Sequence, residues 1–296
     1  MRPTRFITTW ILSVFVSIVG SVGLQTCQAQ GVSVTPLRVL FDGRTRSTTV
    51  FLSNRTSTAN SYRIELVNRR MLQDGNIVPA EEAGPGEYFA DELISFSPRR
   101  VTIAPQAAQT IRLLVRRPRG EIPDDIEYRT HMSIRSIPPT PRLEDIENLE
   151  RVIEEQRIEV QPQVTVETVI PILIRFGDPK AQIRLTRPSF VNVDPELGYS
   201  ALTIDMERSG DRSVYGDLEV FHTPIGGSEV RVFITRGLAI YSPVTIRTKR
   251  IRFRDVDPAR LTSGTLRVRY TETPDMHGDQ TAELIYSIDP GVHNTP

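Results

Sequence analysis

The amino-acid sequence predicts an all-β protein made of two β-sandwich domains. Short runs of alternating apolar and polar residues recur along the chain, and Gly, Pro, Asn or Asp separates them. Only one segment departs from this pattern. The length of 296 residues is enough for two domains of ordinary size.

The first 29 residues have the pattern of an export signal. Arg2 and Arg5 precede an apolar run at 6–24, and Cys27-Gln28-Ala29 resembles a cleavage site. An uncleaved membrane anchor is the alternative, since about 20 apolar residues can span a bilayer. The cleavage site favours the signal peptide. Its removal would take away the only cysteine, so the remaining domains must be stable without disulfides.

The charge of the chain is balanced. There are 36 basic and 36 acidic residues, which gives a net charge of zero. This balance argues against nucleic acid or an anionic membrane as a partner.

The first domain is predicted over residues 30–177. Its strands are expected at 32–41, 48–54, 62–68, 99–103, 110–116 and 128–137, with a long strand at 158–176. The sequence Phe176-Gly177-Asp178-Pro179 then interrupts the pattern, and we place the domain boundary there.

The long strand at 158–176 is the most informative segment. Its even positions from 160 to 174 are mostly Val and Ile, whereas its odd positions begin with Gln and Thr. Its second half, 169–174, is apolar on both faces and is expected to be buried. Its first half has one apolar face, so it is either an ordinary strand on its own core or a sheet edge that needs a partner. The pattern of the strand alone favours the ordinary strand.

The second domain is predicted over residues 178–296. Its strands are expected at 183–186, 201–208, 218–222, 229–234, 246–253, 265–270 and 281–288. Leu202, Ile204 and Met206 illustrate the alternation, because they share one face of their strand. Two sandwiches joined by a short connection leave a cleft, and clefts between domains often bind ligands.

The segment that departs from the β pattern lies in a charged region at 138–158. Within it, apolar residues recur at spacing three over 143–153, among several acidic residues. The segment is either a short helix or a charged loop, and the loop is favoured.

The residues show no catalytic or metal-binding motif. None of the four histidines has a metal-ligand spacing, and there is no nucleophile elbow or phosphate-binding loop. Asp275, His277 and Asp279 could form a metal loop, but Asp and Gly are ordinary turn residues and a turn is favoured. We therefore predict no catalytic residues, no metal and no cofactor.

A set of motifs resembles the periplasmic pilus chaperones of the PapD type. The motifs occur in the order found in that family and cover most of residues 31–176, with a looser match to residue 270. They are VSVTPLRVLFDG at 32–43, SN at 53–54, RL at 112–113, EYR at 127–129, IRSIPP at 134–139 and GTLRVRY at 264–270.

The resemblance implies two immunoglobulin-like sandwiches at an angle. It also implies a periplasmic chaperone that binds pilus or fimbrial subunits and delivers them to an outer-membrane usher, and free chaperone could cap itself by dimerising. In this family the long strand completes a subunit that lacks its last strand. The matching side chains are Val160, Pro162, Val164 and Val166, although proline cannot donate a hydrogen bond to the subunit.

The resemblance further implies a basic pair that holds the terminal carboxylate of the subunit. Arg38 matches the arginine of this pair, but the usual lysine position holds Pro171. An Ile-Pro sequence at this point resembles the archaic pilus systems. Either Arg38 acts alone or another base, such as Arg175, assists it; an ordinary surface arginine is the alternative for Arg38.

Glu127 and Arg175 match an ion pair that fixes the angle between the domains in this family. Its third member, an Asp, is replaced or displaced here, and Glu272 is the nearest candidate. Two other functions stay open: a secreted two-sandwich binding or adhesion module and, more remotely, a hydrolase on a sandwich scaffold. We do not expect an enzyme.

Overall fold

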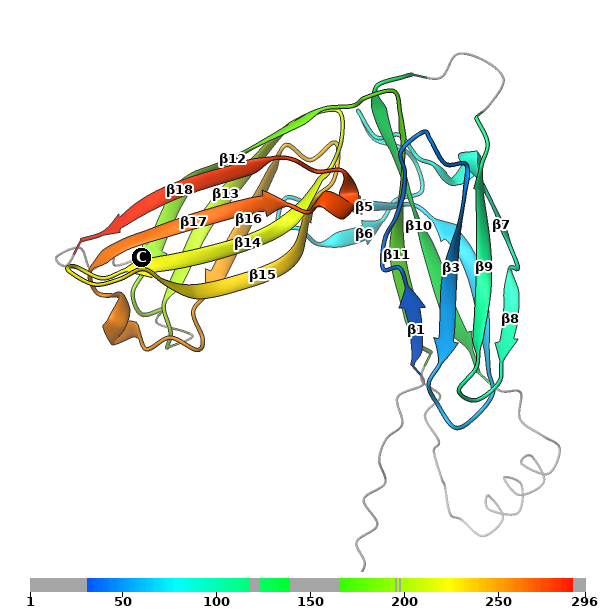
Figure 1. Ribbon diagram of the computed structural model, residues 1–296, viewed down its shortest axis with the longest axis horizontal. Helices are drawn as coiled ribbons and strands as arrows, with labels where there is room; N and C mark the ends of the chain where they lie inside the picture. The colour runs from blue at the N-terminus through cyan, green and yellow to red at the C-terminus, as the bar shows by residue number, and fades with distance from the viewer. Residues whose placement is uncertain (1–30, 118–122, 139–164, 195, 197, 290–296) are drawn as a thin grey trace, which may run out of the picture.

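The computed structural model describes residues 31–117, 123–138, 165–194, 196 and 198–289, and it forms two β-sandwiches at an angle to each other (Figure 1). The predicted fold class is therefore confirmed. The only helical elements among the described residues are three short 3-10 turns, at Asp91–Leu93, Pro258–Leu261 and Pro274–Met276. None of the described helices has the length and apolar character needed to cross a membrane.

The first sandwich consists of a four-stranded and a five-stranded sheet. The first sheet has the order β1 (Val32–Thr35), β3 (Ser47–Asn54), β9 (Ala108–Val115) and β7 (Ile94–Ser97). The second has the order β2 (Val39–Phe41), β11 (Glu167–Phe176), β10 (Ile126–Ile137), β4 (Asn60–Val67) and β8 (Arg100–Ile103).

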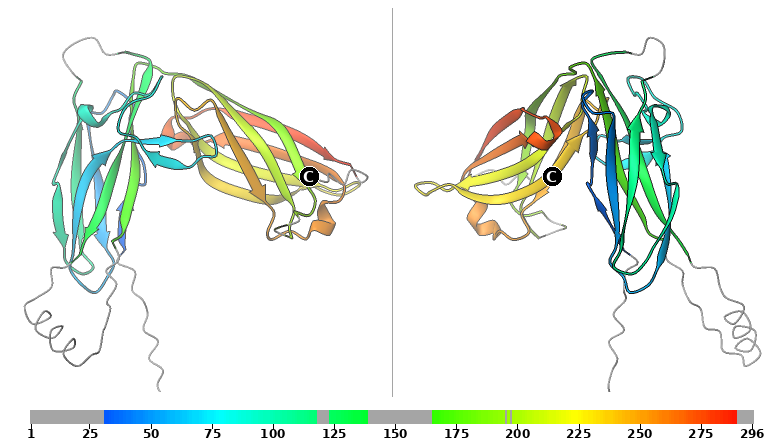
Figure 2. Two further views of the ribbon diagram at one scale, coloured as in Figure 1. Left: turned by 180° about the vertical axis from the view of Figure 1, so that it is seen from behind. Right: turned by 45° about the vertical axis from the view of Figure 1, so that its right-hand side comes forward.

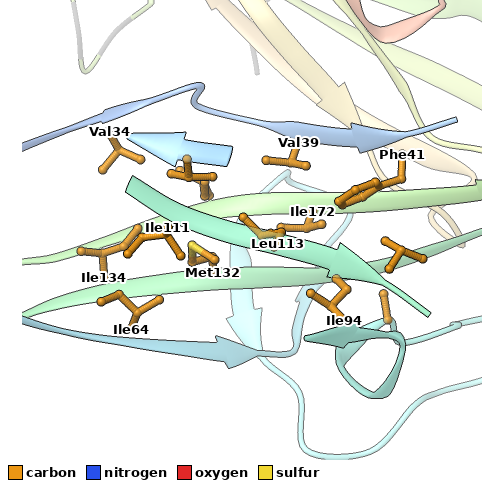
Figure 3. Packing of buried hydrophobic residues seen from close by; sticks show 14 of the residues in the cluster. Val34, Val39, Phe41, Ile64, Ile94, Ile111, Leu113, Met132, Ile134 and Ile172 are labelled. Carbon is orange, nitrogen blue, oxygen red and sulfur yellow. The ribbon is translucent and has the colours of Figure 1, made fainter. Parts of the chain in front are cut away.

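The core of the first sandwich is formed by inward-facing side chains of both sheets (Figure 3). Val50 and Leu52 of β3 alternate with more exposed residues. In the opposite sheet, Met132 and Ile134 of β10 alternate with polar residues that are themselves buried, His131 and Ser133. This alternation is why period-two patterns in the sequence predict the strands well.

The second sandwich consists of a three-stranded and a four-stranded sheet. The first has the order β12 (Ala181–Val191), β13 (Ala201–Gly210) and β16 (Ile246–Arg252), and the second β15 (Val230–Ile240), β14 (Val214–Thr223), β17 (Gly264–Glu272) and β18 (Thr281–Ile288). Leu202, Ile204 and Met206 are fully buried on one face of β13, as the sequence predicts.

The structure corrects the sequence prediction in the first sandwich. The single strand expected at 32–41 is two strands, because the chain leaves β3 at Thr35 and joins β11 from Val39. Pro36, which has no N–H to donate to a ladder, lies at the crossing. Three further strands were not predicted from the sequence: β7, and β5 (Arg69–Met71) and β6 (Ile77–Pro79), which form a hairpin.

The connection between the sandwiches is short and closely packed. β11 ends at Phe176 and β12 begins at Ala181. Gly177 has a φ of +70°, and a Cβ there would lie 2.2 Å from the Asp125 carboxylate oxygen, which also accepts a hydrogen bond from the Asp178 N–H at 2.7 Å. Glycine is thus required by both the backbone conformation and the close approach.

The hairpin β5–β6 projects from the first sandwich toward the second (Figures 1 and 2). The N–H of Thr248 in β16 donates to the carbonyl of Gln73 at 2.9 Å, so the hairpin bonds to an edge strand of the other domain. Between the domains lies an apolar cluster of Met71, Leu173, Ala239, Tyr241 and Met276. Hydrogen bonds and apolar contacts together hold the two sandwiches in one arrangement.

Candidate functional site

One flank of β11 has no neighbouring strand over part of its length. β11 pairs with β10 from Glu167 to Phe176, but with β2 only from Ile172 to Ile174. Over Glu167–Pro171, no strand in the described part of the chain pairs with the side of β11 that faces away from β10. Backbone N–H and C=O groups along such an edge can pair with a strand of another chain.

The apolar face of β11 extends beyond the cover of its own sandwich. Ile170, Ile172 and Ile174 are at most 1% exposed. Thr168 and Val166 continue the same face but are only half-buried. At Val166 the backbone still bonds to β10, because its N–H donates to Ser136 Oγ at 2.9 Å and its C=O accepts from the Ser136 N–H at 2.9 Å. The apolar face therefore reaches the edge of the core while the strand remains in the sheet.

The other residues of the predicted donor strand, Val160, Pro162 and Val164, lie outside the described residues, as does nearly all of the charged loop predicted at 138–158. The predicted signal peptide at 1–29 lies outside them too.

Arg38 lies between the two sandwiches, directly before β2. Its Cζ is 3.2 Å from the ring centroid of Tyr215, and its Nη2 donates to the Tyr241 hydroxyl at 3.2 Å. Both tyrosines belong to the second sandwich. Arg38 also lines a cleft of about 470 Å³ together with Leu37 and His277. The predicted anchor residue is therefore in an interdomain cleft.

The positive charge of Arg38 has no carboxylate partner. Among the described residues no Asp or Glu oxygen lies within 4.0 Å of its guanidinium, and its Nε and Nη1 are buried without a hydrogen-bond partner. The face of the Tyr215 ring compensates the charge in part. A guanidinium in a cleft that has no carboxylate partner in its own chain would be stabilised by the carboxylate of a ligand.

Two further cationic or basic side chains lie on the same face of the sheet. Arg129 and His131 occupy alternate positions of β10, and both are more than nine-tenths buried. The Arg129 Cζ is 4.6 Å from the Tyr241 ring centroid, and the His131 ring meets the same tyrosine edge-on at 6.3 Å. Tyr241 thus contacts Arg38, Arg129 and His131.

Positive charge predominates around His131 in this cluster. Burial, followed by the charges of Arg129, Arg69 and Arg38, lowers the pKa of His131 to about 3. Burial also lowers the pKa of Arg129. The charges of Glu127 and Glu87 act in the opposite direction on Arg129 and raise its pKa. Positive charge is therefore concentrated around His131 and Arg38, and only partly offset near Arg129.

Pro171 lies at the centre of this face. It pairs with His131 across the sheet, and Arg38 precedes the β2 residue that pairs with Ile172 on the other side. Tyr241, which touches both Arg38 and His131, comes from the second sandwich. The polar groups around Pro171 are therefore supplied by neighbouring strands and by the other domain.

Glu127 and Arg175 are brought together in a buried network that joins the sandwiches. Arg175 Nε donates to Glu127 Oε2 at 2.9 Å, and the pair faces each other across β10 and β11. Glu127 Oε1 accepts hydrogen bonds from the N–H (3.2 Å) and the hydroxyl of Ser213. Arg175 Nη1 donates to the carbonyl of Met276 at 2.8 Å. Both members of the predicted pair therefore bond directly to the second sandwich.

Arg175 is not available to assist Arg38 in this structure. All three of its nitrogens have acceptors, since Nη2 donates to the Ser213 carbonyl at 3.4 Å. Glu272, the candidate third member, is instead bound by Arg212 through bonds of 2.7 and 2.9 Å. Ser213 takes the place expected for a third charged residue.

Several residues of this site were missed at the sequence level. The alternation of Glu127, Arg129 and His131 with core residues in β10 was a signal for Arg129 and His131, because polar residues at that spacing share one outward face. Tyr215 and Tyr241 had no such signal, since they lie in other strands of a different domain.

Comparison with known proteins gives matches at the level of structure only. No family model matches the chain, and no curated protein matches it. The CupB2 chaperone of Pseudomonas aeruginosa is similar at a TM-score of 0.41 and 12% identity, over 87% of this chain and 100% of that one. The chaperone DraB of E. coli is similar at 0.43 and 13%, over 86% and 96%.

Two further structures extend these matches. One holds the Salmonella enterica SafA pilin in complex with the SafB chaperone, with a TM-score of 0.44 and 14% identity over 88% of this chain and 97% of that one. The other is the class 5 fimbriae chaperone CfaA, at 0.44 and 10%, over 88% and 100%. All four of these solved structures contain a chaperone, and the SafB chaperone is bound to a pilin.

Proposed function

We propose that this chain is a periplasmic chaperone that binds pilus or fimbrial subunits by donor-strand complementation and delivers them to an outer-membrane usher. The single observation that carries the proposal is the apolar face of β11, which begins at the buried Ile170 and is continued, just before the strand starts, by the half-buried Val166, along a flank that no described strand covers.

The mechanism follows from the chemistry of that flank. A subunit without its last strand has an open groove in its core, and an added strand supplies both backbone hydrogen bonds and apolar side chains. Val166 and, preceding it in the chain, Val164, Pro162 and Val160 would fill the groove at every second position. Each fully buried valine would contribute about 1.5 to 3 kcal/mol to the free energy of binding, before the entropic cost of ordering the strand is subtracted.

The cleft at Arg38 would hold the terminal carboxylate of the bound subunit. The unpaired guanidinium supports this role, because a carboxylate would supply the negative charge that the described residues do not. Anchoring one end of the subunit would also set which positions of the donor strand meet the groove. The subunit's position along the strand would thus be determined at Arg38.

Two substitutions at neighbouring positions of the strand test the donor-strand role. Val166→Asp places a charge on the apolar face, whereas Thr165→Asp places the same charge on the exposed opposite face. Affinity-tagged variants would be expressed in the source cell, and pilus subunits that co-purify from the periplasm would be quantified by mass spectrometry. We expect Val166→Asp to reduce subunit recovery by about 100-fold or more, because a buried carboxylate costs several kcal/mol.

Thr165→Asp should recover subunits as well as the unaltered chain does. Equal recovery by both variants would contradict the donor-strand mechanism. An adhesion module would instead be found at the cell surface, with ligand binding unaffected by either change. Circular dichroism of the purified variants checks that both remain folded.

A further inference from the structure

Arg38 is held in place by the second sandwich, although it belongs to the first. Its two described side-chain partners are the Tyr215 ring and the Tyr241 hydroxyl. The guanidinium lies against the Tyr215 ring, and its Nη2 donates to the Tyr241 hydroxyl, so the two contacts together restrict the orientation of the side chain. A long arginine side chain otherwise loses considerable conformational entropy when it binds a ligand.

The two tyrosines are themselves positioned by their surroundings. Tyr215 lies in β14 opposite Ala239, and its ring has room because residue 237 is glycine; a Cβ there would lie 2.4 Å from the Tyr215 hydroxyl. The backbone N–H of Tyr241 donates to the sulfur of Met71 in the hairpin β5–β6 at 3.5 Å. The space for the Tyr215 ring and the backbone position of Tyr241 therefore both depend on contacts that do not involve Arg38.

Tyrosines suit this task because they orient a cation without neutralising it. An aspartate or glutamate beside Arg38 would pair with the guanidinium and compete with an incoming carboxylate. An aromatic face and a hydroxyl leave the full positive charge available, and Nε and Nη1 still lack acceptors.

We infer that Tyr215 and Tyr241 are positioning residues for Arg38, so that the carboxylate anchor is assembled across both sandwiches and exists only in their observed arrangement. This inference rests on the proposed function of Arg38. It explains how a site without a lysine at Pro171 can hold a carboxylate: the second domain restricts the one arginine to a single orientation.

The test measures carboxylate binding to the full chain, without any subunit. Acetate is titrated, with acetamide as the uncharged probe of the same shape, and the Arg38 Nε–H resonance is followed by NMR and assigned by its loss in Arg38→Ala. We expect saturable binding of acetate and none of acetamide. Tyr215→Leu should weaken acetate binding about tenfold, and Tyr241→Phe about fivefold, since each removes one contact to the cation.

Conservative and distant variants separate positioning from general stability. Tyr215→Phe keeps the ring and should bind acetate within about twofold of the unaltered chain. Tyr286→Leu removes a ring from the same sandwich, packed on Phe190 at 6.1 Å, and should leave acetate binding unchanged. If Tyr215→Leu binds acetate as tightly as Tyr286→Leu does, the inference is wrong. If the unaltered chain binds acetate but captures no subunit, that result would contradict the proposed function and leave the positioning role of the tyrosines intact.

Discussion

The buried pair of Glu127 and Arg175 gives the sharpest stability prediction. Only 1% of the Glu127 side chain and 8% of the Arg175 side chain are exposed. Glu127→Gln keeps the shape but removes the charge, which leaves the guanidinium of Arg175 buried without a carboxylate. The amide also has one acceptor oxygen in place of two, so it cannot accept from both Arg175 and Ser213 in the present geometry.

The expected cost follows from this geometry. Breaking one side of a buried ion pair destabilises a protein by about 3 to 5 kcal/mol. Because the remaining amide keeps one of the hydrogen bonds, we expect a loss of about 3 kcal/mol in the free energy of unfolding. The measurement is urea unfolding at pH 7, followed by circular dichroism.

A matched control is available on the surface of the first sandwich. Glu65 pairs with Arg63 at 2.8 Å, but the side chains are 38% and 65% exposed. Glu65→Gln is the same substitution in an ion pair of similar length, and it should cost less than about 1 kcal/mol. If the two variants lose equal stability, burial does not determine the contribution of the pair and our reasoning is refuted.

The same variant should loosen the arrangement of the domains. Glu127 bonds to Ser213, and its partner Arg175 bonds to the carbonyl of Met276, so the network links the sandwiches at two points. Small-angle X-ray scattering should show a broader distribution of domain orientations for Glu127→Gln than for Glu65→Gln. A scattering curve identical to that of the unaltered chain would show that the hairpin and the apolar cluster hold the angle without the ion pair.

Three further changes have defined outcomes. The pKa of His131 is about 3 in the folded protein and 6.5 for the free side chain. The unfolded chain therefore binds a proton at His131 more readily than the folded chain does. The free energy of unfolding should fall by up to about 5 kcal/mol as the pH falls from 6.5 to 3. In His131→Gln, the free energy of unfolding should depend less steeply on pH. An unchanged pH dependence would contradict the role of His131. Gly177→Ala, at φ +70° and against Asp125, should cost at least about 1 kcal/mol, whereas Gly226→Ala, with a similar φ of +71° but open space, should cost less. Ile172→Ala in the core should lower the free energy of unfolding by about 2 to 5 kcal/mol, and a loss below 1 kcal/mol would contradict its burial.

Much of the fold could be predicted because strand patterns are local. Every strand expected from the period-two alternation overlaps a strand of the structure among the described residues, and the burial of Leu202, Ile204 and Met206 follows the predicted face. The short strands β5 and β6 were missed because three residues are too few to show a period. The four-residue strand β7 was also missed, although β8 of the same length was predicted. The division of 32–41 into β1 and β2 was missed because it depends on which sheet each half joins.

The site was predictable only where the sequence itself carried the information. Arg38, Glu127 and Arg175 were expected from motifs that resemble a known family, and the structure places Glu127 and Arg175 in direct contact. Arg129 and His131 could also have been predicted from the sequence, because their alternation with core residues marks an outward face of β10.

The sequence by itself determined the strands, their inward faces and the apolar continuation of β11, because side-chain alternation along a strand depends on adjacent residues alone. Only the tertiary structure decided what surrounds Arg38. Tyr241 is 203 residues away along the chain and in another domain, and it reaches Arg38 because the linker, the hairpin and the Glu127 network together orient the second sandwich. Contacts of that kind depend on the arrangement of whole domains, which no local pattern of residues records.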